Sequence, residues 1–135
     1  DYELLEKTFI ATPHIAGYSA DGKANGTAMI VNALSSYFKL IKEDWYPELI
    51  PQPHISEITI NAKNRDQEDV IREAVSHTYN IAEDDIKLRF SPSDFEKLRG
   101  EYAVRREFTS FCINLEGGTK IVQKILEGLG FVVNS

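Results

Sequence analysis

The stretch FCINLEGGTKIVQKILEGLGFVV, residues 111–133, decides the fold of this 135-residue chain. Its first apolar residues recur at every second position, which is typical of a half-buried strand: Phe111, Ile113 and Leu115. Thr119 can then cap a helix that stops at Gly128 and Gly130, with apolar residues at helical spacing between them. Residues 131–133 are expected to form a further strand. This stretch alone therefore predicts a strand, a helix and a strand.

Upstream of this stretch, the same kinds of pattern predict a further strand and further helices. Ile58 and Ile60 alternate with polar residues as another strand, and Asp66 can cap an amphipathic helix. Ser91-Pro92 opens a further helix. The order predicts an α+β fold in which a small three-stranded antiparallel sheet, of ferredoxin-like or ACT-like type, carries helices on one face. An uncovered face or edge favours self-association, so residues 56–135 are predicted to be a dimerisation domain that forms a homodimer.

The first 46 residues show a different organisation. Residues 9–11 are predicted to form a short buried strand that stops at Thr12-Pro13. A long amphipathic helix is predicted from about Asp21 to Ile41, with an apolar face of Met29, Ile30, Ala33, Leu34, Tyr37, Phe38 and Ile41. Three of the five prolines fall within residues 47–53, so residues 47–55 are predicted to be an extended linker between two domains, 1–46 and 56–135.

Composition sets limits on the class of protein. Hydrophobic residues make up 42% and charged residues 27%, as in ordinary globular domains. The net charge of -6 argues against a nucleic-acid partner, and without a run of 18 apolar residues no membrane partner is expected. The single cysteine, Cys112, suits a cytoplasmic location. Because the chain lacks an initiator methionine, we expect it to be a piece of a longer protein.

The segment that follows Thr12 carries the residues best suited to chemistry. Pro13 has a fixed φ and favours an extended Thr12, so His14 leaves the segment in a defined direction. Gly17 lets a ligand approach the backbone, and Tyr18 offers a phenol beside it. An imidazole so placed can move protons near neutral pH. Spacing alone leaves two interpretations open, a catalytic histidine and a simple turn residue.

Two stretches resemble a known family. TPHIAGYSADGKANGT, residues 12–27, resembles the C-terminal signature of the D-isomer-specific 2-hydroxyacid dehydrogenases. FEKLRGEYAVRREFTSF, residues 95–111, is similar to a small C-terminal domain that one branch of this family carries and its other members lack. Together the resemblance covers nearly the whole chain. It implies that the N-terminal segment is the tail of an α/β dinucleotide-binding fold.

The resemblance also implies an activity and roles for single residues. The family oxidises 2-hydroxy acids with NAD, and this branch acts on a phosphorylated 2-hydroxy acid. His14 would be the proton-transferring residue, Gly17 would lie against the dinucleotide, and Tyr18 would contact the substrate. The glycine-rich dinucleotide fingerprint is absent, and the family's partner carboxylate and substrate-binding arginine have no match in this chain. We therefore expect an enzymatic parent and no activity from these 135 residues alone.

The other candidate residues leave alternatives open. Arg105 and Arg106 suit a substrate phosphate reached across a dimer interface, or a salt bridge with nearby acids. The scattered histidines and Cys112 form no metal-ligand spacing, so no metal is expected. Residues 83–85 are predicted to be a solvated helix start. Two further interpretations of the chain also stand: an ACT-like regulatory module without catalysis, and part of a phosphoglycerate-oxidising member of the same family.

Overall fold

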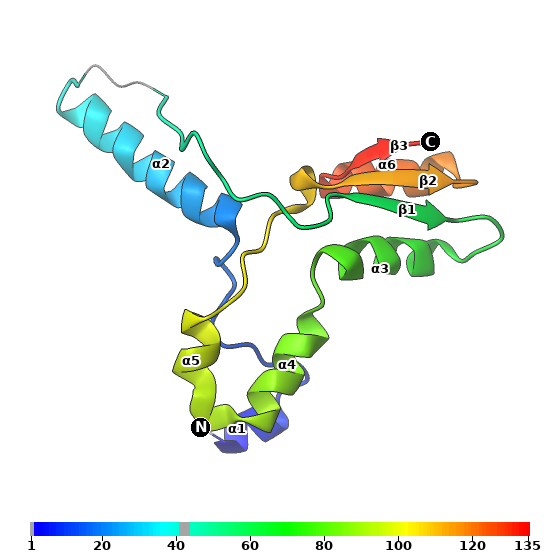
Figure 1. The fold of residues 1–135 in the computed structure, drawn as a ribbon, viewed down its shortest axis with the longest axis horizontal. Coiled ribbons are helices and arrows are strands. Elements are labelled where there is room, and N and C mark those ends of the chain that lie inside the picture. The colour runs from blue at the N-terminus through cyan, green and yellow to red at the C-terminus, as the bar shows by residue number, and fades with distance from the viewer. Residues whose placement is uncertain (1, 41–43) are drawn as a thin grey trace.

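The computed structural model describes residues 2–40 and 44–135. It separates them into three parts (Figure 1): a three-stranded sheet with two helices, a group of short helices, and one long helix. The segment 44–56 contains no helix or strand and leads from the long helix to the sheet. No helix among the described residues is both long enough and apolar enough to cross a membrane.

The sheet is parallel throughout, so the predicted antiparallel pairing is wrong. Its strands are β1 (Glu57–Asn61), β2 (Cys112–Glu116) and β3 (Val132–Asn134), in the order β1-β2-β3. Ile58 lies opposite Ile113, and Cys112 lies opposite Val132. The reason is the connection: a helix after each strand returns the chain to the end of the sheet where that strand began. The parallel pairing gives no support to a ferredoxin-like or ACT-like arrangement.

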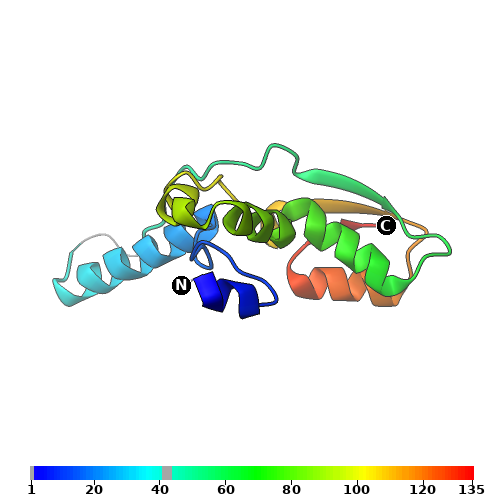
Figure 2. The ribbon, with the colours of Figure 1, turned by 90° about the horizontal axis from the view of Figure 1, so that it is seen from below.

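The two crossover helices lie on one face of the sheet. These are α3 (Gln67–Thr78) and α6 (Lys120–Leu129), which contact each other as well as β1 and β3 respectively (Figure 2). Because the strands follow one another across the sheet in chain order, crossovers of one hand leave both helices on the same side. The expectation of helices on one face is confirmed, and within residues 2–40 and 44–135 no helix covers the other face, called the open face below.

The core lies between this sheet and the two helices. The buried cluster consists of Ile58, Ile60, Ala62, Val70, Ala74, Phe111, Ile113, Leu115, Val122, Leu126 and Phe131. The open face is polar instead. Asn114 Nδ2 donates to Glu57 Oε1 at 2.8 Å, and Asn134 Nδ2 donates to Asn114 Oδ1 at 3.0 Å. Amide and carboxylate side chains therefore join all three strands on the side away from the core.

Local capping signals in the sequence are confirmed. Asp66 caps α3 by accepting a hydrogen bond from the Glu68 amide, and Thr119 caps α6 by accepting one from the Val122 amide. Helix α6 runs through Gly128 and ends at Gly130, whose φ of +107° lies in the left-handed region. Glycine adopts this region without the steric penalty of a Cβ, which explains the stop there.

The group of short helices lies between α3 and β2 in the chain. It comprises α4 (Ile81–Phe90), the 3₁₀ turn η1 (Pro92–Asp94) and α5 (Phe95–Gly100), and a second 3₁₀ turn, η2 (Phe108–Ser110), precedes β2. The sequence patterns predicted only a helix start at residues 83–85 and missed the extent of α4, because its apolar residues do not form one stripe. Leu88 is buried while Ile81, Ile86 and Phe90 are exposed.

The predicted strand at residues 9–11 is wrong. The chain instead begins with α1 (Tyr2–Lys7), and Phe9 is 95% exposed. Backbone groups in and just before this segment form hydrogen bonds with side chains of α4 instead of with a neighbouring strand. Arg89 donates to the carbonyls of Leu5 and Thr8 at 2.7 and 2.8 Å, and the Ala11 amide donates to Asp85 Oδ1 at 2.7 Å. This segment consequently packs beside α4 as an irregular chain.

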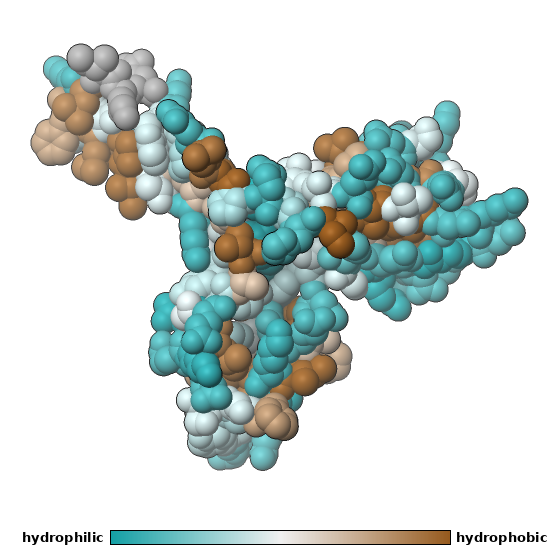
Figure 3. All heavy atoms as spheres, viewed as in Figure 1, coloured by the Kyte–Doolittle hydropathy of each residue, from teal (hydrophilic) through white to brown (hydrophobic). Residues whose placement is uncertain are grey.

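The long helix is α2 (Ala20–Tyr37), as the sequence predicted, although Ile41 lies outside the described residues. Its buried residues are all small: Ala24, Ala28 and Ser35. The apolar side is uncovered within the described chain, and Figure 3 shows hydrophobic side chains gathered along this helix. The exposed apolar residues are Met29, Ile30, Leu34, Tyr37 and Phe38.

Candidate functional site

A tight turn between α1 and α2 presents His14. Its backbone has a φ of +58°, and its amide donates to the Thr12 carbonyl at 2.8 Å. Ile15 is buried with only 2% of its surface exposed, which anchors the turn. The His14 side chain is exposed, and its ring makes no hydrogen bond or ion pair with any residue that the structure describes. The turn therefore leaves both ring nitrogens accessible.

Two glycines in this region serve different purposes. A Cβ added at Gly17 would meet no atom within 4 Å, so the backbone there is open to an approaching ligand. A Cβ at Gly22 would lie 2.9 Å from Ser19 Oγ and 3.3 Å from the Gly17 carbonyl oxygen. Ser19 caps α2 by accepting from the Gly22 amide at 2.9 Å. Gly22 is thus explained by the packing of the turn itself.

Tyr18 is half-buried and surrounded by side chains. Lys23 Nζ lies 4.3 Å from the centroid of its ring, and the ring of Tyr102 meets it edge-to-face at 6.1 Å. The two tyrosines and Lys23 help to line a pocket of about 330 Å³ whose other walls come from α2 and from the segments 47–51 and 103–104. The Tyr18 hydroxyl has no hydrogen-bond partner among the described side chains and backbone groups, so it is available to a ligand.

Arg106 is engaged by the N-terminal part of the chain. Its Nε and Nη2 donate to the two oxygens of Asp21, and Nη1 donates to the Pro51 carbonyl. Burial alone would raise the pKa of Asp21, but hydrogen bonds from Arg106 and from the Glu107 amide outweigh it and lower that pKa. Of the two sequence alternatives for Arg106, the geometry favours the salt bridge, with a partner 85 residues away.

Arg105 has a different environment. Its guanidinium lies over the ring of Tyr79 at 4.3 Å, and its Nε is buried without a hydrogen-bond partner in the described part of the chain. With Arg106, it lines a pocket of about 290 Å³ that also includes His54 and His77. The structure thus brings four basic side chains to one hollow, although the sequence placed the histidines in unrelated elements.

The predicted solvated helix start at residues 83–85 is wrong for two of its three acids. Asp84 is only 9% exposed, and its Oδ2 accepts hydrogen bonds from the hydroxyls of Tyr79 and Tyr102 at 2.7 and 2.9 Å. Asp85 pairs with Arg89 at 2.9 Å. Asp84 is covered because its side of α4 faces Tyr102 from another segment, whereas Asp85 is covered by Arg89 one turn along the same helix, at a spacing that the sequence does contain.

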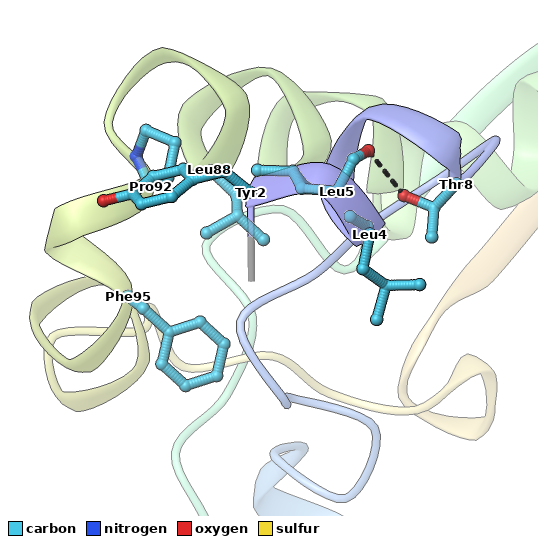
Figure 4. Close-up of a pocket in the computed structure, with 8 residues that line it drawn as sticks. Tyr2, Leu4, Leu5, Thr8, Leu88, Pro92 and Phe95 are labelled. Carbon is cyan, nitrogen blue, oxygen red and sulfur yellow. Dashed lines mark hydrogen bonds between the residues drawn. The ribbon is translucent and has the colours of Figure 1, made fainter.

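An apolar hollow lies between α1 and the α4–α5 turn. It measures about 350 Å³ and is lined by Tyr2, Leu4, Leu5, Thr8, Ala11, Leu88, Pro92 and Phe95. Figure 4 shows the Phe95 and Leu4 side chains on opposite sides of it, while the Thr8 hydroxyl is turned to the Leu5 carbonyl. No charged side chain lines this hollow, so we assign it no catalytic group. Within residues 2–40 and 44–135, no group of three metal-ligating side chains is found.

Comparison with known proteins gives a consistent result. Residues 49–130 match a family described as a domain of unknown function, DUF3410. Erythronate-4-phosphate dehydrogenases of Marinobacter nauticus and Tolumonas auensis are 34% and 36% identical to the chain, over 96% and 98% of its length. The corresponding enzyme of Bacteroides thetaiotaomicron is 45% identical over 82% of the chain.

The alignments cover only part of each relative. The chain accounts for 35% of the Marinobacter and Tolumonas proteins and for 29% of the Bacteroides protein. It therefore spans about a third of the length of the curated relatives that it matches. By these similarities the chain belongs to the DUF3410 family and is related to one portion of the erythronate-4-phosphate dehydrogenase sequence.

Proposed function

We propose that this chain is the C-terminal part of an NAD-dependent erythronate-4-phosphate dehydrogenase. The parent would oxidise 4-phospho-D-erythronate to 2-oxo-3-hydroxy-4-phosphobutanoate, a step toward pyridoxal 5'-phosphate. The names of its relatives support the reaction class. The observation that carries the proposal is the turn that exposes the His14 imidazole four residues before the unpaired Tyr18 hydroxyl.

The residues of this turn suit separate tasks in such an oxidation. NAD, when bound, would accept a hydride from carbon 2 of the substrate. His14 would take the proton of the hydroxyl on that carbon, since a neutral imidazole is a suitable general base. Gly17 has the open backbone that a dinucleotide needs in order to approach closely. Tyr18 would hold the substrate through its hydroxyl, with Lys23 beside its ring.

Arg105 is the stronger candidate of the two arginines for the substrate phosphate. Its Nε has no partner in the described residues, whereas Arg106 is held by Asp21. An arginine binds phosphate well because its planar donors match the oxyanion. We propose that Arg105 reaches the phosphate across a dimer interface and that Arg106 orients the segment that carries it.

Residues 56–135 are proposed to be the dimerisation domain, joined by the linker 47–55 to residues 1–46. An open sheet face and two free strand edges support self-association of this part. Thr59→Arg, on the open face of the sheet, should weaken a dimer. Ser76→Arg, on the exposed side of α3, should not. Sedimentation of the full-length protein would measure this, and equal behaviour of both variants would contradict association through the open face. Titration with amino acids tests the alternative ACT-like regulatory role.

The rest of the parent would complete the active site. We propose that it supplies the dinucleotide fingerprint, the histidine's carboxylate partner and the substrate arginine, and covers the exposed apolar side of α2. The cytoplasm is the proposed location, in keeping with the single cysteine. These assignments imply that the isolated 135 residues have no dehydrogenase activity, which an assay of the purified chain with NAD and substrate would test.

His14→Asn in the full-length enzyme is the decisive experiment. Loss of a general base lowers turnover by about 10² to 10⁴, so we expect kcat to fall in that range. Lys124→Asn, at an exposed basic residue of α6 that lines none of the pockets described above, is the control and should keep kcat within about two-fold. An active His14→Asn enzyme would contradict the proposal.

A further inference from the structure

A partly buried hydrogen-bonded cluster lies beside Tyr18. Its members are Tyr79 at the end of α3, Asp84 on α4 and Tyr102 just after α5. The two tyrosines donate to the same carboxylate oxygen, Asp84 Oδ2, at 2.7 and 2.9 Å. Neither the resemblance of the sequence nor the names of the relatives assigns this cluster a role. It connects the region preceding the last two strands to the turn that carries His14.

Tyr102 occupies a fixed position in this cluster. Its hydroxyl donates to a carboxylate that is itself only 9% exposed, and hydrogen bonds to charged acceptors are stronger than neutral ones. Burial, together with the neighbouring Tyr79 and Asp84, raises the pKa of Tyr102. Tyr102 therefore remains a protonated donor wherever the protein is folded near neutral pH. Because the hydroxyl lies on the axis of the ring, this bond fixes the direction in which the Tyr102 side chain extends.

The Tyr102 ring in turn limits where Tyr18 can lie. The two rings meet edge-to-face, with centroids 6.1 Å apart and planes at 77°. Lys23 Nζ is 4.3 Å from the centroid of the Tyr18 ring, which restricts the ring further. The Tyr18 hydroxyl remains unpaired among the described residues while its ring is held. Such a side chain is oriented in advance for a ligand.

We propose that Tyr102, anchored by Asp84, is a positioning residue that orients Tyr18 toward the substrate. The inference rests on the proposed role of Tyr18 in substrate binding. It makes residues 79–102 a part of the substrate site through Tyr18, the residue that Tyr102 orients. An edge-to-face aromatic pair contributes about 0.5–1.5 kcal/mol, so loss of the Tyr102 ring should weaken substrate binding by up to about ten-fold.

The test uses full-length enzyme and separate Michaelis constants for the phosphorylated substrate and for NAD. Tyr102→Leu should raise the substrate KM up to about ten-fold and leave the NAD KM within about two-fold. Tyr102→Phe keeps the ring and loses the hydroxyl that binds Asp84, and Asp84→Asn weakens that bond by removing the charge of its acceptor. Both should therefore give a smaller rise of up to about three-fold. Tyr46→Phe removes an exposed tyrosine–Asn25 hydrogen bond and is the matched control, with no change in either constant.

A double-mutant cycle separates positioning from general loss of stability. In a Tyr18→Ala background, Tyr102→Leu should change the substrate KM less than two-fold, because the residue that it positions is gone. Additive effects, or an equal rise in both Michaelis constants, would overturn the inference. The inference also fails if Tyr18→Ala raises the substrate KM but Tyr102→Phe and Tyr102→Leu both leave it unchanged. If Tyr18→Ala itself leaves the substrate KM unchanged, the proposed role of Tyr18 fails first.

Discussion

Arg106 and Asp21 form a two-point ion pair that joins the first turn of α2 to the segment before β2. The distance from Arg106 Nε to Asp21 Oδ2 is 2.9 Å, and that from Arg106 Nη2 to Asp21 Oδ1 is 3.0 Å. The Arg106 side chain is 9% exposed and the Asp21 side chain 13%. The Glu107 amide donates to the same carboxylate at 2.8 Å. This pair fixes α2, and with it the turn from His14 to Tyr18, against the C-terminal part of the chain.

Asp21→Asn should destabilise the protein markedly. Removing one partner of a covered ion pair leaves the other charge without compensation, and the usual loss is about 3 kcal/mol. Urea unfolding of the two proteins at pH 7 measures the difference. Asp69→Asn is the control, because Asp69 pairs with Arg72 at the surface at 3.4 Å and such pairs contribute less than about 1 kcal/mol. Equal losses in the two variants would contradict a special role for Asp21.

The contribution of Asp21 should depend on pH in the acid range. Its pKa is lowered in the folded protein, so its stabilising effect is complete above the unfolded aspartate pKa of about 3.9 and disappears as pH falls through the folded value. The gap in unfolding free energy between wild type and Asp21→Asn should hold steady from pH 7 to about 5 and shrink below about 4. A gap that is constant down to pH 2 would disprove this linkage.

Arg89 should protect the N-terminal segment from proteolysis. Its guanidinium binds the carbonyls of Leu5 and Thr8, and Asp85 binds both Arg89 and the Ala11 amide. Arg89→Met removes these donors while keeping an unbranched side chain. Trypsin should then cleave after Lys7 at least several-fold faster, as mass spectrometry of timed digests would show. Arg72→Met, on the exposed side of α3, should leave that rate unchanged.

Gly22 and Gly26 should respond oppositely to alanine although both lie in α2. A Cβ at Gly26 meets no atom within 4 Å, so Gly26→Ala should stabilise the chain by up to about 1 kcal/mol through helix propensity. A Cβ at Gly22 collides with the capping hydroxyl of Ser19, and loss of a cap costs about 1 kcal/mol. Thermal unfolding of both variants provides the comparison. A similar increase in Tm for both would show that Ser19 does not cap α2 as described.

Sequence alone determined the elements whose signals are local. Asp66, Thr119 and Gly130 mark helix ends because capping hydrogen bonds and left-handed glycines act within a few residues. Alternation in β1 and β2 likewise indicated which residues face the core. The turn with His14, Gly17 and Tyr18 was identified by its resemblance to a family, and the proposed roles of those three residues remain predictions.

Tertiary structure alone decided what depends on partners distant in the chain. Parallel pairing of the strands follows from the path of the crossover helices, because alternation is the same in parallel and antiparallel sheets. Asp84 accepts a hydrogen bond from Tyr102, 18 residues away in the chain, and Asp21 is paired with an arginine 85 residues away. No short-range pattern records such contacts, because they exist only once the backbone has brought those segments together.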